Sequence, residues 1–155
     1  MVYDVIIAGG SFAGLAVATQ LRGRRVLILD RKPVGTGQTS ACGTIMPALE
    51  HWHAEESVLQ VHHSLFLHTA GRDIEFKSPY PWCTFDYARL CHILLGQTGA
   101  EVWRAAVTGL TGHIVHTTAG DFEGRCLVGR LGLAGSIGQR SATGLRPPGS
   151  DELRR

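Results

Sequence analysis

A glycine-rich segment, Gly9-Gly10-Ser11-Phe12-Ala13-Gly14, stands close to the start of the sequence. It approximates the pattern G-x-G-x-x-G, in which the first glycine permits a tight turn, the second lets the backbone approach a pyrophosphate, and the third lets a helix pack closely on a strand. Ser11 takes the second position, where its small side chain leaves room and its hydroxyl could bind a phosphate oxygen. A helix that begins here would also offer free N–H groups to phosphates. The segment therefore predicts a phosphate-binding turn.

A carboxylate follows at the distance that dinucleotide binding requires. Asp30 ends the apolar run Val26–Leu29 and comes 21 positions after Gly9. A carboxylate at this place can accept hydrogen bonds from ribose hydroxyls. Its charge disfavours a 2′-phosphate, although the adjacent Arg31 keeps NADP open. We predict nucleotide binding, and the competing interpretation is a glycine turn that serves only helix–strand packing.

The elements that must position these residues fit inside the first 30 residues. The nearly continuous apolar run at 3–8 predicts a strand buried on both faces, and 26–29 predicts a second one. Between them, 13–21 has helical spacing and Gly23 ends it. Strand, turn, helix and strand make a βαβ unit, whose crossover is expected to be right-handed.

After Asp30 the pattern changes, and the rest predicts a mixed region. A nicotinamide-binding domain normally runs from the second strand into another helix, whereas a long loop here suits a chain that crosses a larger cofactor, FAD. The fold class is therefore α/β: a Rossmann-like FAD-binding domain with a parallel sheet, a crossover helix and a β-meander, in truncated form. The expected elements are a loop over 31–47, a short helix over 48–57, a hairpin of 58–70 and 73–76, a helix over 86–95 begun by Asp86, a strand at 101–105, and a meander of 107–110, 114–118 and 122–128.

Composition excludes several classes of protein. Apolar residues make up 44% and charged residues 18% of the 155 residues, which suits one globular domain. No apolar run has the length of a membrane span, and the N-terminus lacks the features of a secretory signal. The four cysteines form no CxxC pair, which favours a reduced, cytoplasmic location. They are Cys42, Cys83, Cys91 and Cys126.

The basic charge lies at one end of the chain. The net charge is +2, yet residues 129–155 hold five Arg against Asp151 and Glu152. The excess comes from this tail alone, so it does not indicate a nucleic-acid partner. The tail is rich in Gly and Arg, lacks aromatic residues and shows no periodicity, which predicts disorder. We divide the chain into 1–128, the N-terminal part of an FAD-binding domain, and 129–155.

Other constellations favour ordinary packing. A cluster of histidines has no HExxH pattern and no nearby Cys or carboxylate to complete a tetrahedral site, so we predict no metal. Cys42 is either a redox thiol beside a flavin or a small loop residue. No catalytic triad emerges, and the catalytic residues remain unassigned. The clustered histidines are His51, His53, His62, His63 and His68.

Two stretches, YDVIIAGGSFAGLAVATQL and VLILDR, resemble the FAD-binding end of the flavoprotein family of geranylgeranyl reductases and aromatic-ring hydroxylases. Ala41-Cys42-Gly43, TFDYARLCHIL and GAEVWRAAVTGL are similar to the geranylgeranyl-reductase-like branch in particular, and the likeness extends over 2–128. The resemblance implies an FAD-dependent oxidoreductase, either a reductase or a monooxygenase. It implies a small-molecule substrate, isoprenoid or aromatic, with NAD(P)H as a candidate electron donor.

The resemblance also implies roles for individual residues. Asp30 would bind the adenosine ribose, with Arg31 near the adenine. Cys42 and Gly43 would lie in the loop towards the flavin, and Ala106 or Val107 would touch the adenine through backbone atoms. An Arg usually stands three residues before the Phe-Asp pair in that branch, where this sequence has Trp82. The residues that would cradle the pyrophosphate are Gly9, Gly10, Ser11, Phe12, Ala13 and Gly14.

Later motifs of the family are missing from this sequence. After the meander such proteins have Asp-Gly or Asp-Ala-x-Gly, then a Gly-Asp motif and a substrate-covering sheet. Removing one base after the Val128 codon of a back-translation restores Val-Asp-Ala-Ser-Gly, so we hypothesise that a frameshift near residue 129 produced the tail. We expect this chain to be inactive alone and to bind FAD weakly. The alternative is a stand-alone NAD(P)- or nucleotide-binding module without catalysis, whose tail is native.

Overall fold

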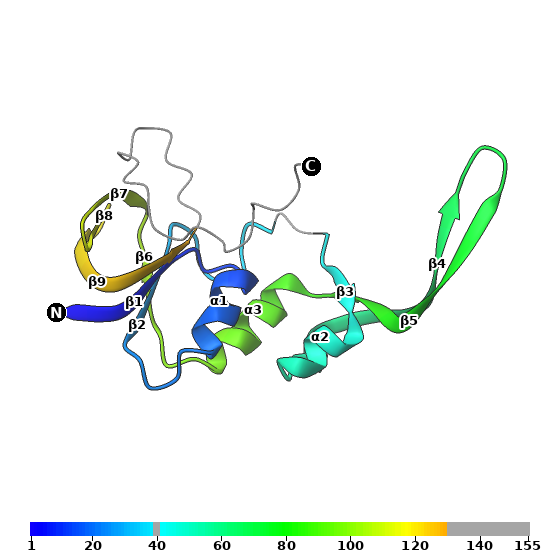
Figure 1. The fold of residues 1–155 in the computed structure, drawn as a ribbon, viewed down its shortest axis with the longest axis horizontal. Coiled ribbons are helices and arrows are strands. Elements are labelled where there is room, and N and C mark those ends of the chain that lie inside the picture. The colour runs from blue at the N-terminus through cyan, green and yellow to red at the C-terminus, as the bar shows by residue number, and fades with distance from the viewer. Residues whose placement is uncertain (39–40, 130–155) are drawn as a thin grey trace, which may run out of the picture.

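The computed structural model describes residues 1–38 and 41–129, which form two sheets and the helices beside them (Figure 1). The larger sheet has the strand order β6-β2-β1-β9-β8-β7, and the smaller has the order β3-β5-β4. The elements are β1 (Val2–Ala8), α1 (Phe12–Thr19), β2 (Val26–Asp30), β3 (Gly43–Ile45), α2 (Met46–His51), η1 (Glu55–Ser57), β4 (Val58–His68), β5 (Asp73–Phe85), α3 (Tyr87–Gly96), β6 (Glu101–Arg104), β7 (Val107–Thr111), β8 (Ile114–Thr117) and β9 (Gly120–Gly129).

The predicted βαβ unit is present. β1 and β2 pair in parallel, from Val5 opposite Val26 to Ala8 opposite Leu29. α1 connects them and ends at Thr19, slightly earlier than the sequence predicted. β6 then pairs in parallel with β2, as the predicted strand at 101–105 required. The carboxyl ends of these strands, where ligands bind in open parallel sheets, therefore meet at one edge.

The central strands are buried on both faces, which is why their sequences lack polar residues. Ile7 and Ile28 face α1 and α3, where they pack with Leu15 and other apolar side chains. Ile6 and Leu27 face the opposite way, towards the meander. The two helices and the meander thus lie on opposite sides of β1 and β2 (Figure 1).

The meander joins the larger sheet through its last strand. β7, β8 and β9 pair antiparallel in succession, as predicted, and β9 then runs parallel to β1. This register brings Gly129 opposite Ala8, where a Cβ on Gly129 would lie 2.7 Å from the Ala8 carbonyl oxygen. β9 therefore ends beside the start of the glycine turn.

Several predicted boundaries after Asp30 were wrong. The second half of the loop expected over 31–47 holds β3 and the start of α2, and the helix expected over 48–57 is divided into α2 and η1. The hairpin is confirmed, but its second strand continues to Phe85 instead of ending at 76. β3 is short and becomes a strand only because it pairs with the far end of β5, from Gly43 opposite Thr84 to Ile45 opposite Trp82.

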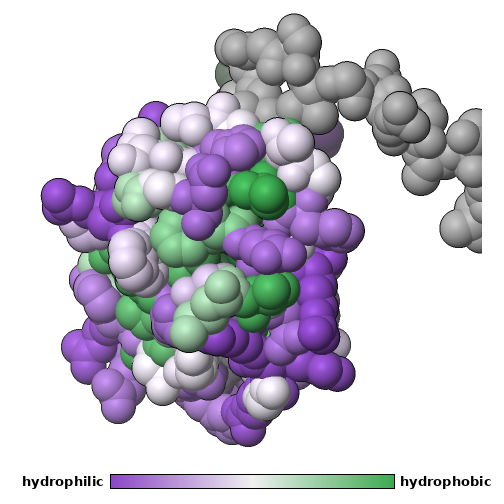
Figure 2. Space-filling model, turned by 90° about the vertical axis from the view of Figure 1, so that its left-hand side faces the viewer, coloured by the Kyte–Doolittle hydropathy of each residue, from purple (hydrophilic) through white to green (hydrophobic). Residues whose placement is uncertain are grey.

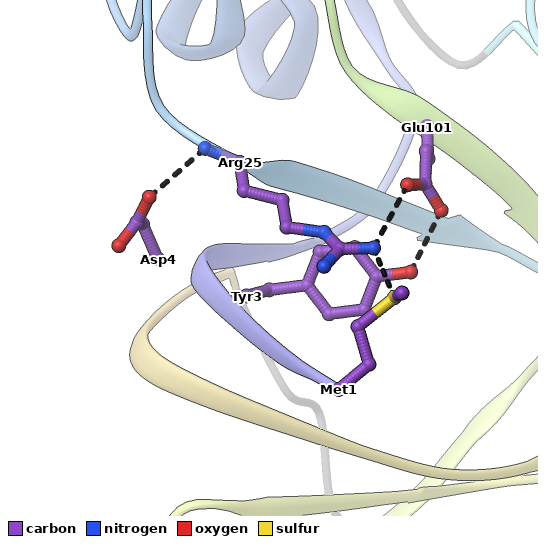
Figure 3. A network of polar contacts seen from close by, with 5 residues as sticks. All are labelled: Met1, Tyr3, Asp4, Arg25 and Glu101. Carbon is purple, nitrogen blue, oxygen red and sulfur yellow. Dashed lines mark hydrogen bonds and ion pairs between the residues drawn. The ribbon is translucent and has the colours of Figure 1, made fainter.

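A network of polar contacts holds the amino ends of the strands (Figure 3). The Tyr3 hydroxyl donates to Glu101 Oε2 at 2.7 Å, and the Arg25 guanidinium lies 4.9 Å from the Tyr3 ring centre. Arg25 also forms an ion pair with Glu101 at 3.5 Å and contacts the Met1 sulfur. Burial, together with the Glu101 carboxylate, raises the pKa of Tyr3. The network ties β1 to β6 across β2 at the edge opposite the glycine turn.

Three further expectations concern the C-terminal tail, membrane-spanning helices and metal binding. The disorder predicted for the tail concerns residues 129–155, of which only Gly129 belongs to the described residues. Within the described part of the chain, no helix combines the length and apolar character needed to cross a membrane. Within the same residues, no group of three or more His, Cys, Asp or Glu side chains could hold a metal ion.

Candidate dinucleotide-binding site

The glycine turn connects β1 to α1 with little space between them. Gly9 has φ of +123°, a conformation that favours glycine, and its N–H donates to the Leu29 carbonyl at 2.8 Å. A Cβ on Gly14 would lie 2.0 Å from the Gly9 carbonyl oxygen and 3.2 Å from Ile7. Gly14 therefore lets α1 approach β1, which is the task that the sequence pattern assigned to it.

Asp30 lies directly against this turn. Its Oδ2 accepts a hydrogen bond from the Gly10 N–H at 2.7 Å, and its Oδ1 accepts one from the Lys32 N–H at 2.9 Å. A carboxylate offers about four acceptor positions, so these two bonds leave acceptor capacity on a side chain that is only half-buried. The strand end thus brings one carboxylate to the glycine turn and fixes its orientation.

The first turn of α1 presents unsatisfied amides beside that carboxylate. The first N–H groups of a helix have no partner inside the helix. The Leu15 N–H donates to the Ser11 carbonyl at 2.9 Å, whereas the N–H groups of Ser11, Ala13 and Gly14 have no acceptor among the described residues. The Ser11 side chain makes no capping bond, and no acidic residue occupies the first turn. This end of the helix is therefore suited to an anion.

Phe12 points away from the site. Its ring packs edge-on against Tyr87 of α3, with ring centres 6.1 Å apart. Burial raises the pKa of Tyr87 to about 12, and the neighbouring Cys91 contributes to the rise. Burial also raises the pKa of Cys91. The contact between Phe12 and Tyr87 thus packs α1 against α3.

The residues predicted near the adenine come to the same edge of the sheet. The Ala105 N–H donates to the Asp30 carbonyl at 2.8 Å, which brings the segment after β6 beside Asp30. The backbone of Ala106 is already bonded: its N–H donates to Thr118 Oγ1 at 3.1 Å, and its carbonyl accepts from the Thr118 N–H at 3.0 Å. Val107 opens β7 opposite Thr117. Arg31 is exposed and forms no ion pair with a described residue.

Cys42 and Gly43 have structural roles that the sequence did not reveal. Cys42 is buried with φ of +51°, and its carbonyl accepts a hydrogen bond from the Phe85 N–H at 2.9 Å. A Cβ on Gly43 would lie 2.9 Å from the Trp82 Nε1, so only glycine lets the indole lie there. Trp82, which stands where the related branch has an Arg, thus packs against Gly43.

A cleft of about 370 Å³ opens beside Cys42 and the N-terminus of α3. Several of its lining residues belong to the stretches that carry the family resemblance, Ala41-Cys42-Gly43 and TFDYARLCHIL, but their convergence on one cleft was not predicted. It depends on the pairing of β3 with the end of β5, which places Thr84 opposite Gly43. The lining residues are Gly35, Gln38, Ala41, Cys42, Leu59, Thr84, Phe85, Asp86, Tyr87 and Ala88.

Comparisons with known proteins identify the fold. No family model and no curated protein matches the sequence. A variant of PqsL from P. aeruginosa has a TM-score of 0.71 at 17% identity, and the match covers 86% of this chain and 44% of PqsL. The myxobacterial chondrochloren halogenase CndH, of the FAD-dependent halogenases, has a TM-score of 0.65 at 22% identity, covering 83% of this chain and 37% of CndH.

The anhydrotetracycline hydroxylase OxyS from Streptomyces rimosus is also similar. Its TM-score is 0.60 at 28% identity, and the match covers 83% of this chain and 31% of OxyS. The chain thus shares its fold with an FAD-dependent halogenase and with this hydroxylase. It spans less than half the length of each of these proteins.

Proposed function

We propose that residues 1–128 are the FAD-binding part of an FAD-dependent oxidoreductase of the hydroxylase or halogenase kind. One observation carries the proposal: the Asp30 carboxylate lies 2.7 Å from the Gly10 N–H, next to the unsatisfied amides that open α1. Amide donors for a pyrophosphate and a carboxylate acceptor for ribose hydroxyls therefore lie side by side, as the adenosine diphosphate half of FAD requires.

The residues present fit that half of the cofactor. A Cβ on Gly9 would meet no atom within 4 Å, so the space beside the turn is open. The amides of Ser11, Ala13 and Gly14 would hold the pyrophosphate, and the remaining acceptor capacity of Asp30 would bind the ribose. When bound, FAD supplies the redox chemistry, and the protein supplies binding and orientation.

The likeness to flavin-dependent enzymes favours FAD over the alternative of a stand-alone NAD(P)-binding module. The Asp30 carboxylate also disfavours NADP, because its negative charge repels the 2′-phosphate of that cofactor. The structures compared above include a halogenase and a hydroxylase, and they give no particular support to the geranylgeranyl-reductase branch. An isoprenoid or aromatic substrate and NAD(P)H as electron donor therefore remain proposals drawn from the sequence resemblance.

We expect no turnover from this chain alone. Its matches cover 31% of OxyS and 44% of PqsL, so most of the corresponding enzyme lies beyond the matched part. The described residues offer contacts to the adenosine end, and we therefore expect weak binding. ADP should bind about as well as FAD, whereas FMN, which lacks the adenosine, should not bind.

Calorimetric titration of the full chain with FAD, ADP and FMN tests the proposal. Asp30→Asn keeps the shape of the side chain but removes its charge, and should weaken FAD and ADP binding about tenfold or more, since a hydrogen bond to a charged group contributes about 1.5–3 kcal/mol. Asp121→Asn is the matched control, because Asp121 is an exposed residue that pairs with His116 at 3.0 Å in the meander. Equal affinities of Asp30→Asn and the unchanged protein, or no binding of ADP at millimolar concentration, would overturn the proposal.

A further inference from the structure

Residues 32–37, which follow Asp30, form a closed turn that packs on α3. The Thr36 N–H donates to the Pro33 carbonyl at 3.2 Å, and Gly35 has φ of +79° at the third position, where a type II turn needs a positive φ. A Cβ on Gly35 would lie 3.1 Å from the Cα of Ala88 in α3. This segment, which we call the 32–37 loop, therefore has a fixed place beside the helix.

The 32–37 loop also contacts the candidate dinucleotide site. The Lys32 N–H donates to Asp30 Oδ1 at 2.9 Å, and the Gly10 N–H donates to Oδ2 of the same carboxylate at 2.7 Å. A Cβ on Gly10 would lie 3.4 Å from Val34 Cγ2. A single side chain, that of Asp30, thus connects the backbone of Lys32 to the glycine turn.

The Lys32 side chain turns back over its own loop. A Cβ on Gly37 would lie 2.8 Å from Lys32 Cδ and closer still to the ammonium, so the lysine stem lies directly on the Gly37 backbone. Gly37 has φ of +69°, a conformation that favours glycine. Lys32 is exposed, and among the described residues its ammonium forms no ion pair.

The opposite end of the molecule has a different character. Figure 2 shows the end formed by the meander, where hydrophobic residues are interspersed with hydrophilic ones. In the last strand of the meander, Arg125 already pairs with Asp4 at 3.3 Å. The positive charge of Lys32, beside the glycine turn, is by contrast available to an anion from outside the protein.

A diphosphate bound at the glycine turn needs such a charge. The amides that open α1 carry only partial positive charge, and the Asp30 carboxylate beside them adds a negative charge that repels phosphate. An ammonium on the loop that Asp30 itself holds offsets this repulsion. Lysine binds phosphate as a compact point charge on a flexible stem, so its ammonium can move from Gly37 to the ligand.

We propose that Lys32 binds a phosphate of the bound nucleotide, so that the site selects adenosine diphosphates over adenosine. This inference rests on the proposed function and adds a specificity-determining residue to it. Asp30 and Lys32 then divide the recognition between them. The carboxylate accepts the ribose hydroxyls, and the ammonium neutralises the phosphates.

Calorimetric titration of the full chain with adenosine and with ADP tests this inference. Lys32→Met keeps most of the stem but removes the charge, and should weaken ADP binding about fivefold, as for the loss of an exposed ion pair, while adenosine binding stays unchanged. Lys32→Arg keeps the charge and should bind ADP nearly as well as the unchanged protein. Lys77→Met is the matched control, because Lys77 is the only other lysine of the sequence and is exposed on β5.

The outcomes separate this inference from the proposed function. If the unchanged protein binds ADP and Lys32→Met binds it equally well, the role of Lys32 is wrong and the dinucleotide site stands. The same follows if Lys32→Met weakens adenosine and ADP binding by the same factor, since Lys32 would then act through Asp30 and not on phosphate. If the unchanged protein does not bind ADP, both are overturned.

Acetylation of the two lysines gives a second readout on the unchanged protein. Mass spectrometry after treatment with acetic anhydride measures the rate of modification at Lys32 and at Lys77 separately. Saturating ADP should slow the modification of Lys32 several-fold, adenosine should slow it less, and the rate at Lys77 should stay the same in both. An unchanged rate at Lys32 with ADP bound would overturn the inference.

Discussion

Gly14 is the residue at which sequence and geometry agree most closely. A Cβ there would lie 2.0 Å from a backbone oxygen of Gly9, and backbone cannot move aside as a flexible side chain can. The pattern predicted this approach because the turn, the strand before it and the helix after it are local in sequence. Asp30 was predictable for the same reason, since only one helix separates it from the turn.

Gly14→Ala tests the close approach of α1 to β1. We expect a loss of about 2 kcal/mol or more in the free energy of unfolding, as for overpacked sites, together with weaker ADP binding because the amides of the first turn move. Urea denaturation followed by circular dichroism measures the first effect. Gly96→Ala is the control, because a Cβ on Gly96 at the end of α3 would meet no atom within 4 Å. A Gly14→Ala protein as stable as Gly96→Ala would show that the approach is looser than the structure indicates.

Other residues of the site could not be assigned from sequence. The left-handed backbone of Cys42 and the contact of Gly43 with the Trp82 indole depend on β3 meeting β5 almost 40 residues later. Neither feature can be recognised from the neighbouring residues in the sequence. The resemblance placed Cys42 and Gly43 towards the flavin, whereas the structure shows what they do for packing, and their role towards a cofactor stays a prediction.

At the scale of elements, α3 shows how a helix start can be read from sequence. The Asp86 carboxylate accepts a hydrogen bond from the Arg89 N–H at 2.8 Å, and the Asp86 carbonyl accepts one from the Leu90 N–H at 3.0 Å. This is an ordinary N-cap, and the sequence predicted it from the residue type and the helical pattern that follows. The cap also fixes the wall of the cleft beside Cys42.

Asp86→Ala should lower the free energy of unfolding by about 1 kcal/mol, because it removes the cap of α3. Asp86→Asn should keep most of that stability, since asparagine caps helices about as well. Thermal and urea denaturation of the two variants measure the difference. If Asp86→Asn is as unstable as Asp86→Ala, the charge of Asp86 matters more than its capping bond.

The elements that the sequence missed depend on long-range pairing. β5 continues through Pro79 and Pro81, residues that argue against a strand when read locally, because they lie in an irregularity of the ladder between the pairs His62–Trp82 and Ser64–Lys77. The start of α2 was missed for a related reason. Pro47 lies in the first turn of that helix, where proline is favoured, although in a Gly-, Ser- and Thr-rich context it indicated a loop.

At the scale of the whole molecule, the larger sheet collects the predicted nucleotide contacts at one edge. The glycine turn follows β1, Asp30 ends β2, and the segment with Ala106 and Val107 follows β6, the neighbouring strand. This arrangement follows from parallel strands in the order β6-β2-β1. The βαβ unit predicted the glycine turn and Asp30 at this edge, whereas the place of β6 beside β2 was not predicted. The hairpin of β4 and β5 was predicted from its local pattern, whereas the extension of β5 to Phe85 and its pairing with β3 were not, because they depend on which strands the smaller sheet contains.

The central claim is that the amides opening α1 and the carboxylate ending β2 together bind an adenine dinucleotide. Titration of ¹⁵N-labelled protein with ADP, observed in amide correlation spectra, tests it residue by residue. We predict saturable shifts for Gly9 to Gly14 and for Asp30 and Arg31, and none for the hairpin of β4 and β5. The ADP concentration needed for half-saturation should rise about tenfold or more in Asp30→Asn and stay unchanged in Asp121→Asn. Shifts confined to other parts of the chain, or none at millimolar ADP, would contradict the claim.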